Sequence, residues 1–176
     1  MPKISAWIGA ARLRTLPLSL SGIIVGTALA SMYSQFSWDI FVLALLTTVG
    51  FQITSNFAND YGDGVKGTDN ENRQLSRNEL KMGIIISIVI CALLTIALLY
   101  VAFGTKYLLF TVIFGALGVF SIWAAIKYTV GSSAYGYKGL GDVFVFLFFG
   151  LLGVMGSMFL YTKTLYAMSI FPAVAI

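Results

Sequence analysis

The sequence predicts an all-α protein, a multi-pass transmembrane helical bundle. Hydrophobic residues make up 59% of the 176 residues and charged residues only 10%, whereas a soluble domain carries roughly 25% charged residues. Long uncharged runs separate the charges, each about as long as the 20 or so apolar residues with which a helix crosses a bilayer. These two observations exclude an ordinary water-soluble domain.

Five of the uncharged runs predict five full spans, and a sixth run is shorter. The predicted spans cover residues 16–34, 39–58, 82–103, 107–126 and 143–161. The last run, residues 164–176, would extend as a helix for roughly 20 Å through a hydrocarbon core about 30 Å thick. We therefore expect one membrane domain over residues 1–176, apparently truncated to five full spans plus a partial sixth.

The N-terminal segment predicts a lead-in helix on the membrane surface. Arg12 and Arg14 precede a full-length span, and no small-residue cleavage site follows a short apolar core, so a cleavable signal peptide is not expected. The segment should lie on the inner leaflet, with Pro17 opening the first span. Within the spans small residues recur, as at Gly22 and Gly26, which predicts close packing of helices.

The basic residues predict the orientation of the bundle. If the N-terminus is cytoplasmic, nine of the eleven Lys and Arg residues lie on the cytoplasmic side, and only Lys106 and Lys163 lie outside. The positive-inside rule then predicts a multi-pass protein of the cell inner (plasma) membrane, with the N-terminus and the active site cytoplasmic. Because the few basic residues are explained by topology, no nucleic acid partner is expected.

The composition also excludes several kinds of active site. The chain has no histidine, which excludes a His-based triad, a His general base and a His metal site. Its single cysteine, Cys91, lies in an apolar run and is interpreted as a small buried residue. Neither an intramolecular disulfide nor a thiolate metal cluster is possible within this chain.

A stripe of polar residues marks the inner end of the second predicted span. Gln52, Asn56, Asn59, Asp60 and Asp63 recur at spacings of three and four, which places them on one face of a helix. Lipid cannot satisfy the hydrogen bonds of such a stripe, so it must face protein or a water-filled cavity. We therefore expect the stripe to line a pocket that opens to the cytoplasm.

The acidic residues of this region predict a magnesium site. Asp60 and Asp63 should project together, with Asp69 folding back from the following glycine-bearing loop. Carboxylates without His or Cys suit Mg²⁺, which proteins usually share with substrate phosphates. A diphosphate substrate is implied, and Lys66 and Arg73 would contact its oxygens. The alternative is a solvated loop of mixed charge.

A second polar cluster lies on the same side of the membrane, between the fourth and fifth predicted spans. Lys127 and Lys138 bracket a loop rich in tyrosine and glycine that includes Tyr128 and Tyr137. The functional interpretation is a loop that closes over the diphosphate and presents Lys or Tyr donors. The alternative interpretation is interfacial anchoring of the chain by these side chains.

Three motifs, in this order along the chain, resemble those of the UbiA superfamily of membrane prenyltransferases. They are residues 12–19 (RLRTLPLS), 56–64 (NFANDYGDG) and 137–146 (YKGLGDVFVF). The resemblance implies a UbiA-like fold, of which this chain would be the N-terminal portion. It also implies Mg²⁺ held through Asp60 and Asp63, with Asn56, Asn59 and Asp69 nearby, and a polyprenyl diphosphate donor.

The resemblance is greatest to the branch that prenylates 1,4-dihydroxy-2-naphthoate with loss of CO₂, giving demethylmenaquinone in menaquinone biosynthesis. Two alternatives remain. The chain could belong to an aromatic prenyltransferase with another acceptor, such as 4-hydroxybenzoate or homogentisate, or it could be a non-catalytic small membrane bundle protein. The family has nine helices and a second aspartate-rich motif, whereas this chain stops near the sixth. Its loop after Arg73 also lacks an Arg-bearing segment typical of the family. We therefore expect little or no product from this chain alone.

Overall fold

The computed structural model describes residues 4–33, 35–66, 74–132 and 134–175, and every regular element within these ranges is helical. Within these ranges five helices are long and apolar enough to cross a membrane, which confirms the predicted multi-pass bundle. They cover Ile4–Met32, Trp38–Val65, Arg77–Phe103, Leu108–Thr129 and Gly141–Thr162. The described part of the sixth apolar run forms the short helices η4 (Ala167–Ser169) and α8 (Ile170–Ala175).

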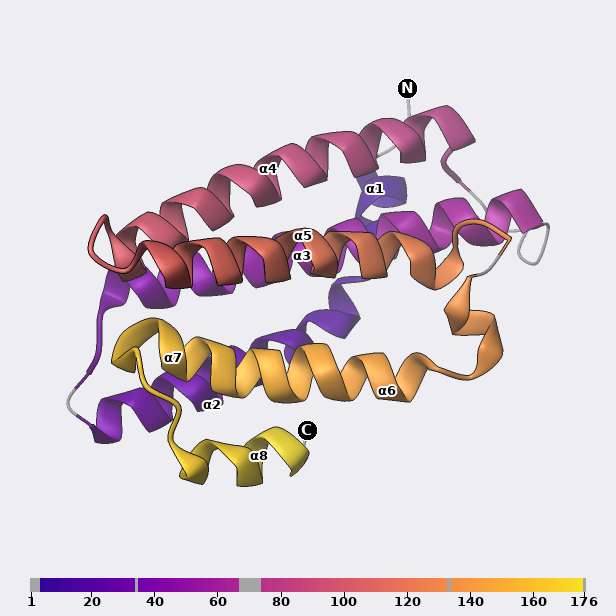
Figure 1. Ribbon diagram of the computed structural model, residues 1–176. Coiled ribbons are helices and arrows are strands. Elements are labelled where there is room, and N and C mark those ends of the chain that lie inside the picture. The colour runs from indigo at the N-terminus through magenta and orange to yellow at the C-terminus, as the bar shows by residue number, and fades with distance from the viewer. Residues whose placement is uncertain (1–3, 34, 67–73, 133, 176) are drawn as a thin grey trace.

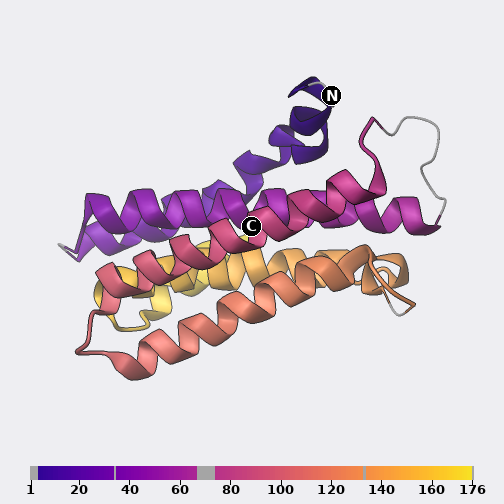
Figure 2. The ribbon, with the colours of Figure 1, turned by 90° about the horizontal axis from the view of Figure 1, so that it is seen from above.

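The central element is α3 (Trp38–Lys66), which packs mainly against four other helices and also touches α7 (Ser157–Thr162). The four main partners are α1 (Ile4–Ala11), α2 (Leu16–Met32), α4 (Arg77–Phe103) and α5 (Leu108–Thr129). Figure 1 shows α2 running beside the layer of α6 (Gly141–Val145), the π-helical segment η3 (Phe146–Gly156) and α7 (Ser157–Thr162). Figure 2 shows the axes of the long helices roughly aligned, with α3, α4 and α5 running in alternating directions, so connecting segments gather at two ends of the bundle.

The helix α3 extends further than expected. The sequence predicts a span ending at residue 58, with the glycines that follow in a loop, but α3 continues to Lys66. A close helix crossing explains the difference, because a Cβ at Gly62 would lie 2.6 Å from the Thr129 hydroxyl oxygen on α5. The motif residues from Asn56 to Asp63 therefore stand on a regular helix held against α5.

The start of α4 is also earlier than expected, at Arg77 instead of residue 82. Ser76 and Glu79 form a capping box, in which each side chain accepts a hydrogen bond from the other residue's backbone N–H. The Arg77 side chain donates to the carbonyl of Gly64, at 2.9 Å, and so ties the start of α4 to the end of α3.

The first helix, α1, packs on α3 and α4. Its alanines Ala6 and Ala10 are buried. The rings of Trp7 and Phe57 pack edge to face, with their centroids 5.5 Å apart. A Cβ at Gly83 on α4 would lie 2.7 Å from the Trp7 ring, so the small residue makes room for the indole. The predicted lead-in segment is thus a packed part of the bundle.

Small residues allow α2 to approach η3 closely, as the glycine pattern predicts. A Cβ at Gly22 would lie 2.6 Å from the Phe149 carbonyl oxygen, and one at Gly26 would lie 2.3 Å from the Val154 carbonyl oxygen. Neither position has room for a methyl group. The same reasoning applies to Gly150, where a Cβ would lie 2.3 Å from the carbonyl oxygen of Ala173 on α8.

We predict that Gly26→Ala destabilises the bundle by about 1–3 kcal/mol, because the methyl group has to push α2 away from η3. Thermal unfolding of the detergent-solubilised chain measures this effect. Gly115→Ala is the matched control, since its nearest neighbour would be a Leu99 methyl at 3.9 Å, an ordinary contact. Equal thermal stability of the two variants would contradict the proposed close approach.

Candidate functional site

The polar stripe of α3 divides between two cavities. Gln52, Asn56 and Asn59 line a cavity of about 480 Å³, whereas Asp60 and Asp63 line a smaller one of about 230 Å³. The expectation that the whole stripe lines one pocket is therefore wrong. The physical reason is the N-terminal segment, which lies across α3 and whose Arg12 borders both cavities.

The larger cavity is polar at one level of α3 and apolar at another. Ala44 and Asn59 both line it, and 15 residues of helix separate them by about 22 Å along the axis. Around Asn59 the lining includes Arg12, Gln52 and Asn56. The apolar lining comes from several helices and includes Ile23, Leu98, Phe114, Phe148 and Leu160. Such a cavity suits an amphiphile with a polar head and a long apolar tail.

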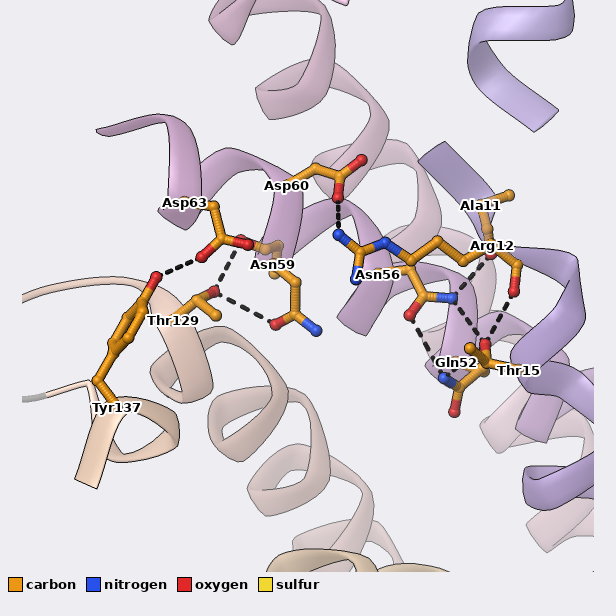
Figure 3. A network of polar contacts seen from close by, with 11 residues as sticks. Ala11, Arg12, Thr15, Gln52, Asn56, Asn59, Asp60, Asp63, Thr129 and Tyr137 are labelled. Atoms are coloured by element: carbon orange, nitrogen blue, oxygen red, sulfur yellow. Dashed lines mark hydrogen bonds and ion pairs between the residues drawn. The ribbon is translucent and has the colours of Figure 1, made fainter. Parts of the chain in front are cut away.

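The amides of α3 hold the N-terminal turn in place, as Figure 3 shows. Asn56, which is 3% exposed, donates through Nδ2 to the Ala11 carbonyl at 2.8 Å and to Thr15 Oγ1 at 3.2 Å. Gln52 Nε2 donates to the same Thr15 oxygen at 3.1 Å. The Thr15 hydroxyl in turn donates to the Arg12 carbonyl at 2.9 Å. These hydrogen bonds connect the amide stripe to the backbone of Arg12.

Arg12 lies at this site, although the sequence interpretation did not name it among the candidate site residues. Its backbone adopts the left-handed conformation, with φ 47° and ψ 52°, which is unusual for a residue other than glycine. Its guanidinium forms an ion pair with Asp60. Motif 12–19 was the signal that could have assigned Arg12 to the site, since that motif carries part of the family resemblance.

The second predicted cluster reaches the end of α3 through a tyrosine. Tyr137 lies in the short helix η2 (Tyr135–Lys138), and its hydroxyl donates to an Asp63 carboxylate oxygen. Thr129, buried at the end of α5, donates to the Ala58 carbonyl at 3.0 Å and lies 3.3 Å from Asn59 Oδ1. Asp60 and Asp63 thus turn toward different partners, Arg12 on one side and Tyr137 on the other (Figure 3).

The other residues that the sequence predicts for the site differ in whether they line either cavity. Tyr128 lines the larger cavity, whereas Lys127 and Lys138 border neither cavity. Lys66 ends α3. The side chain of Lys66 lies outside the described part of the chain, as do the whole of Asp69 and Arg73.

An aromatic wall faces the polar end of the larger cavity from α5, η2 and α6. Tyr135 stacks on Phe144 with ring centroids 3.9 Å apart, and its hydroxyl donates to the Ala124 carbonyl at 2.7 Å. Burial, and secondarily the neighbouring Tyr128, raise the pKa of Tyr135 to about 12. The Tyr135 hydroxyl therefore keeps its proton throughout the physiological pH range and remains a neutral hydrogen-bond donor.

The donor set at the end of α3 fits a magnesium ion. Asp60, Asp63 and Asn59 offer only carboxylate and amide oxygens, the ligands that Mg²⁺ prefers. No group of three or more His, Cys, Asp or Glu residues that could hold a metal occurs among the described residues. Two carboxylates match the usual protein contribution to Mg²⁺ sites whose other ligands are water and substrate phosphates.

A multi-pass α-helical bundle with an amide and carboxylate face beside an apolar cavity is the arrangement expected of a membrane prenyltransferase. The chain belongs to the UbiA prenyltransferase family, whose model matches residues 19–176. This match confirms the resemblance inferred from the three motifs. No solved structure matches the chain significantly.

The chain is similar to several bacterial proteins named 1,4-dihydroxy-2-naphthoate octaprenyltransferase. It is 45% identical to that of Escherichia coli (strain K12) and 42% identical to that of Haemophilus influenzae, in each case over 98% of this chain and 59% of the relative. The protein of that name from Mycobacterium leprae is 36% identical over 89% of this chain and 54% of its own length. The chain thus spans less than two thirds of the length of the relatives it matches.

We predict that Asn56→Leu destabilises the chain by about 1–3 kcal/mol, because it removes the side-chain amide donor and leaves the buried Ala11 carbonyl without this hydrogen bond. The N-terminal turn should also become more accessible, so trypsin should cleave after Arg12 or Arg14 faster than in the unsubstituted chain. Ser55→Ala, on the same helix and in the lining of the same cavity, is the control. Unchanged cleavage in Asn56→Leu would argue against this anchoring role.

Proposed function

We propose that the chain binds a polyprenyl diphosphate and takes part in the Mg²⁺-dependent transfer of its polyprenyl group to 1,4-dihydroxy-2-naphthoate, a step of menaquinone biosynthesis. The larger cavity carries this proposal, since it joins an apolar volume within the bundle to the amides of α3 and to the guanidinium of Arg12, which pairs with Asp60 beside it. The names of the relatives support the choice of acceptor and of a long prenyl chain.

In this proposal the two parts of the donor occupy different parts of the site. The prenyl tail lies among the apolar residues between α2, α3, α4, α5 and η3, where its burial is favoured by the hydrophobic effect. The diphosphate lies at the level of Asn59, beside Arg12 and Asp60. Asp60 and Asp63 would hold Mg²⁺, which when bound neutralises charge on the diphosphate oxygens.

The chain's own residues would then favour departure of the diphosphate. The allylic C–O bond breaks, the diphosphate leaves with the electron pair, and the prenyl carbon becomes cationic. Hydrogen-bond donors that the fold holds in place before the reaction stabilise the negative charge that develops on the leaving diphosphate. The faces of Tyr128, Tyr135, Phe144 and Phe148, which all line the cavity, provide π density toward the cation and shield it from water. The acceptor ring forms the new C–C bond and loses its carboxyl group as CO₂.

The charge distribution supports an orientation with this site at the cytoplasmic face of the inner membrane. Arg12 pairs with Asp60, and Arg77 donates to the carbonyl of Gly64 at the same end of α3. Lys127 and Lys138 stand in the elements whose Thr129 and Tyr137 contact that end. Among the basic residues that the structure describes, Lys106 and Lys163 lie at the opposite end, beside the rings of Tyr107 and Phe103. Soluble diphosphate released in the reaction would therefore return to the cytoplasm.

We predict that Asp63→Asn reduces Mg²⁺-dependent binding of farnesyl diphosphate by at least about tenfold, because a ligand charge is lost from the metal site. Equilibrium dialysis of the detergent-solubilised chain, with and without Mg²⁺, measures the binding. Asp39→Asn is the matched control, an exposed carboxylate at the opposite end of α3. Wild-type and Asp63→Asn chains that bind the diphosphate equally would contradict the metal assignment.

We further predict that 1,4-dihydroxy-2-naphthoate binds this chain more tightly than 4-hydroxybenzoate or homogentisate, since the two-ring acceptor covers more of the aromatic wall. Competition for labelled 1,4-dihydroxy-2-naphthoate in the presence of Mg²⁺ and farnesyl diphosphate ranks the three acceptors. Preference for one of the single-ring acids would assign the chain to a different aromatic acceptor.

A further inference from the structure

Arg12 occupies a position that the proposed binding of Mg²⁺ and diphosphate does not by itself explain. It borders both cavities, and its guanidinium pairs with Asp60, one of the two expected metal ligands. The two side chains are partly buried, at 35% and 24% exposure, so their attraction is screened less than that of a surface pair. A cation is thus held at the carboxylate that Mg²⁺ would have to approach.

The backbone of Arg12 is set by its surroundings and not by its own preference. A left-handed conformation at a non-glycine residue is unfavourable and persists only where neighbouring contacts impose it. Here the N–H of Arg12 donates to Gly9, and its carbonyl accepts from both the N–H and the hydroxyl of Thr15. The amides of Asn56 and Gln52 hold Thr15 in turn. These contacts fix the position of the Arg12 backbone, from which the side chain with its guanidinium extends.

We propose that Arg12 exchanges its guanidinium between Asp60 and the substrate diphosphate. Without ligands Arg12 compensates the charge of Asp60; when Asp60 serves as a metal ligand, the guanidinium turns to the diphosphate oxygens. The proposal rests on the function proposed above and adds to it a residue that senses whether both ligands are present. Asn56, Gln52 and Thr15 are positioning residues in this scheme, since they act through Arg12.

The exchange follows from competition between two cations for one carboxylate. An anchored guanidinium next to Asp60 weakens the binding of Mg²⁺ alone, because Mg²⁺ has to displace it and is repelled by it. When a diphosphate is present, the displaced guanidinium gains a planar, two-pronged hydrogen-bonding partner. Because each ligand changes the affinity of the other by the same factor, diphosphate should strengthen Mg²⁺ binding more in the wild-type chain than in a chain that lacks the Arg12 guanidinium.

Two affinities, which should change in opposite directions in the same variant, test this role on the detergent-solubilised full chain. Arg12→Gln should bind Mg²⁺ alone about threefold more tightly, since the competing ion pair is lost. The same variant should bind farnesyl diphosphate in saturating Mg²⁺ about tenfold more weakly, since a charged hydrogen-bond donor is lost. Titration calorimetry with MgCl₂ alone, followed by titration with farnesyl diphosphate, gives both affinities.

Arg14→Gln is the matched control, because Arg14 lies two residues away, is exposed and borders neither cavity. It should leave both affinities unchanged. Arg12→Lys keeps the charge but not the fork of donors, so it should bind Mg²⁺ as the wild type does and farnesyl diphosphate more weakly. In an Asp60→Asn background, Arg12→Gln should no longer tighten Mg²⁺ binding.

The outcomes separate this proposal from the function on which it rests. If Arg12→Gln weakens both affinities together, or changes neither, the exchange is wrong while Mg²⁺-dependent diphosphate binding by the wild type still supports the proposed function. If the wild type itself binds no farnesyl diphosphate, the proposed function fails and the exchange fails with it. Circular dichroism and gel filtration of each variant establish that the helical fold is kept, and Arg12→Lys carries the test if Arg12→Gln unfolds.

Discussion

The site depends on the hydrogen bonds by which the amides of α3 hold the N-terminal turn. Within a bilayer, polar side chains have to be satisfied by the protein itself. Asn56 and Gln52 meet this requirement by binding the Ala11 carbonyl and the Thr15 hydroxyl. In doing so they place the turn across the face of α3. The position of Arg12, the ion pair with Asp60 and the division of the polar stripe between two cavities all follow from this contact.

A second constraint shapes the cavity, namely how closely the helices approach one another. Where α2 crosses η3, Gly22 and Gly26 leave no room for a side chain. The same helices carry Ile23 and Phe149 into the lining of the larger cavity. Tight packing along one seam and open volume beside it are therefore produced by the same pair of elements. This arrangement leaves an apolar space that ends at the polar groups of α3, as membership of the UbiA prenyltransferase family leads one to expect.

Much of the fold was predictable because its signals are local. Uncharged runs set the number of spans, and the spacing of Gln52, Asn56 and Asn59 placed three amides on one helix face. The helix ends were less accurate, since α3 continues to Lys66 through a glycine-rich segment. That extension depends on the contact between Gly62 and Thr129, residues far apart in the chain. Composition alone does not report such a contact.

The sequence by itself determined that the chain is a multi-pass helical bundle, which residues form its polar helix and which family its motifs resemble, because hydropathy and short motifs are properties of neighbouring residues. Only the tertiary structure decided what those residues face. It turned Asp60 toward Arg12 and Asp63 toward Tyr137, and it gave Arg12 a left-handed backbone between two cavities. These features require segments that are distant in the chain to meet, and packing of whole helices determines which segments do so.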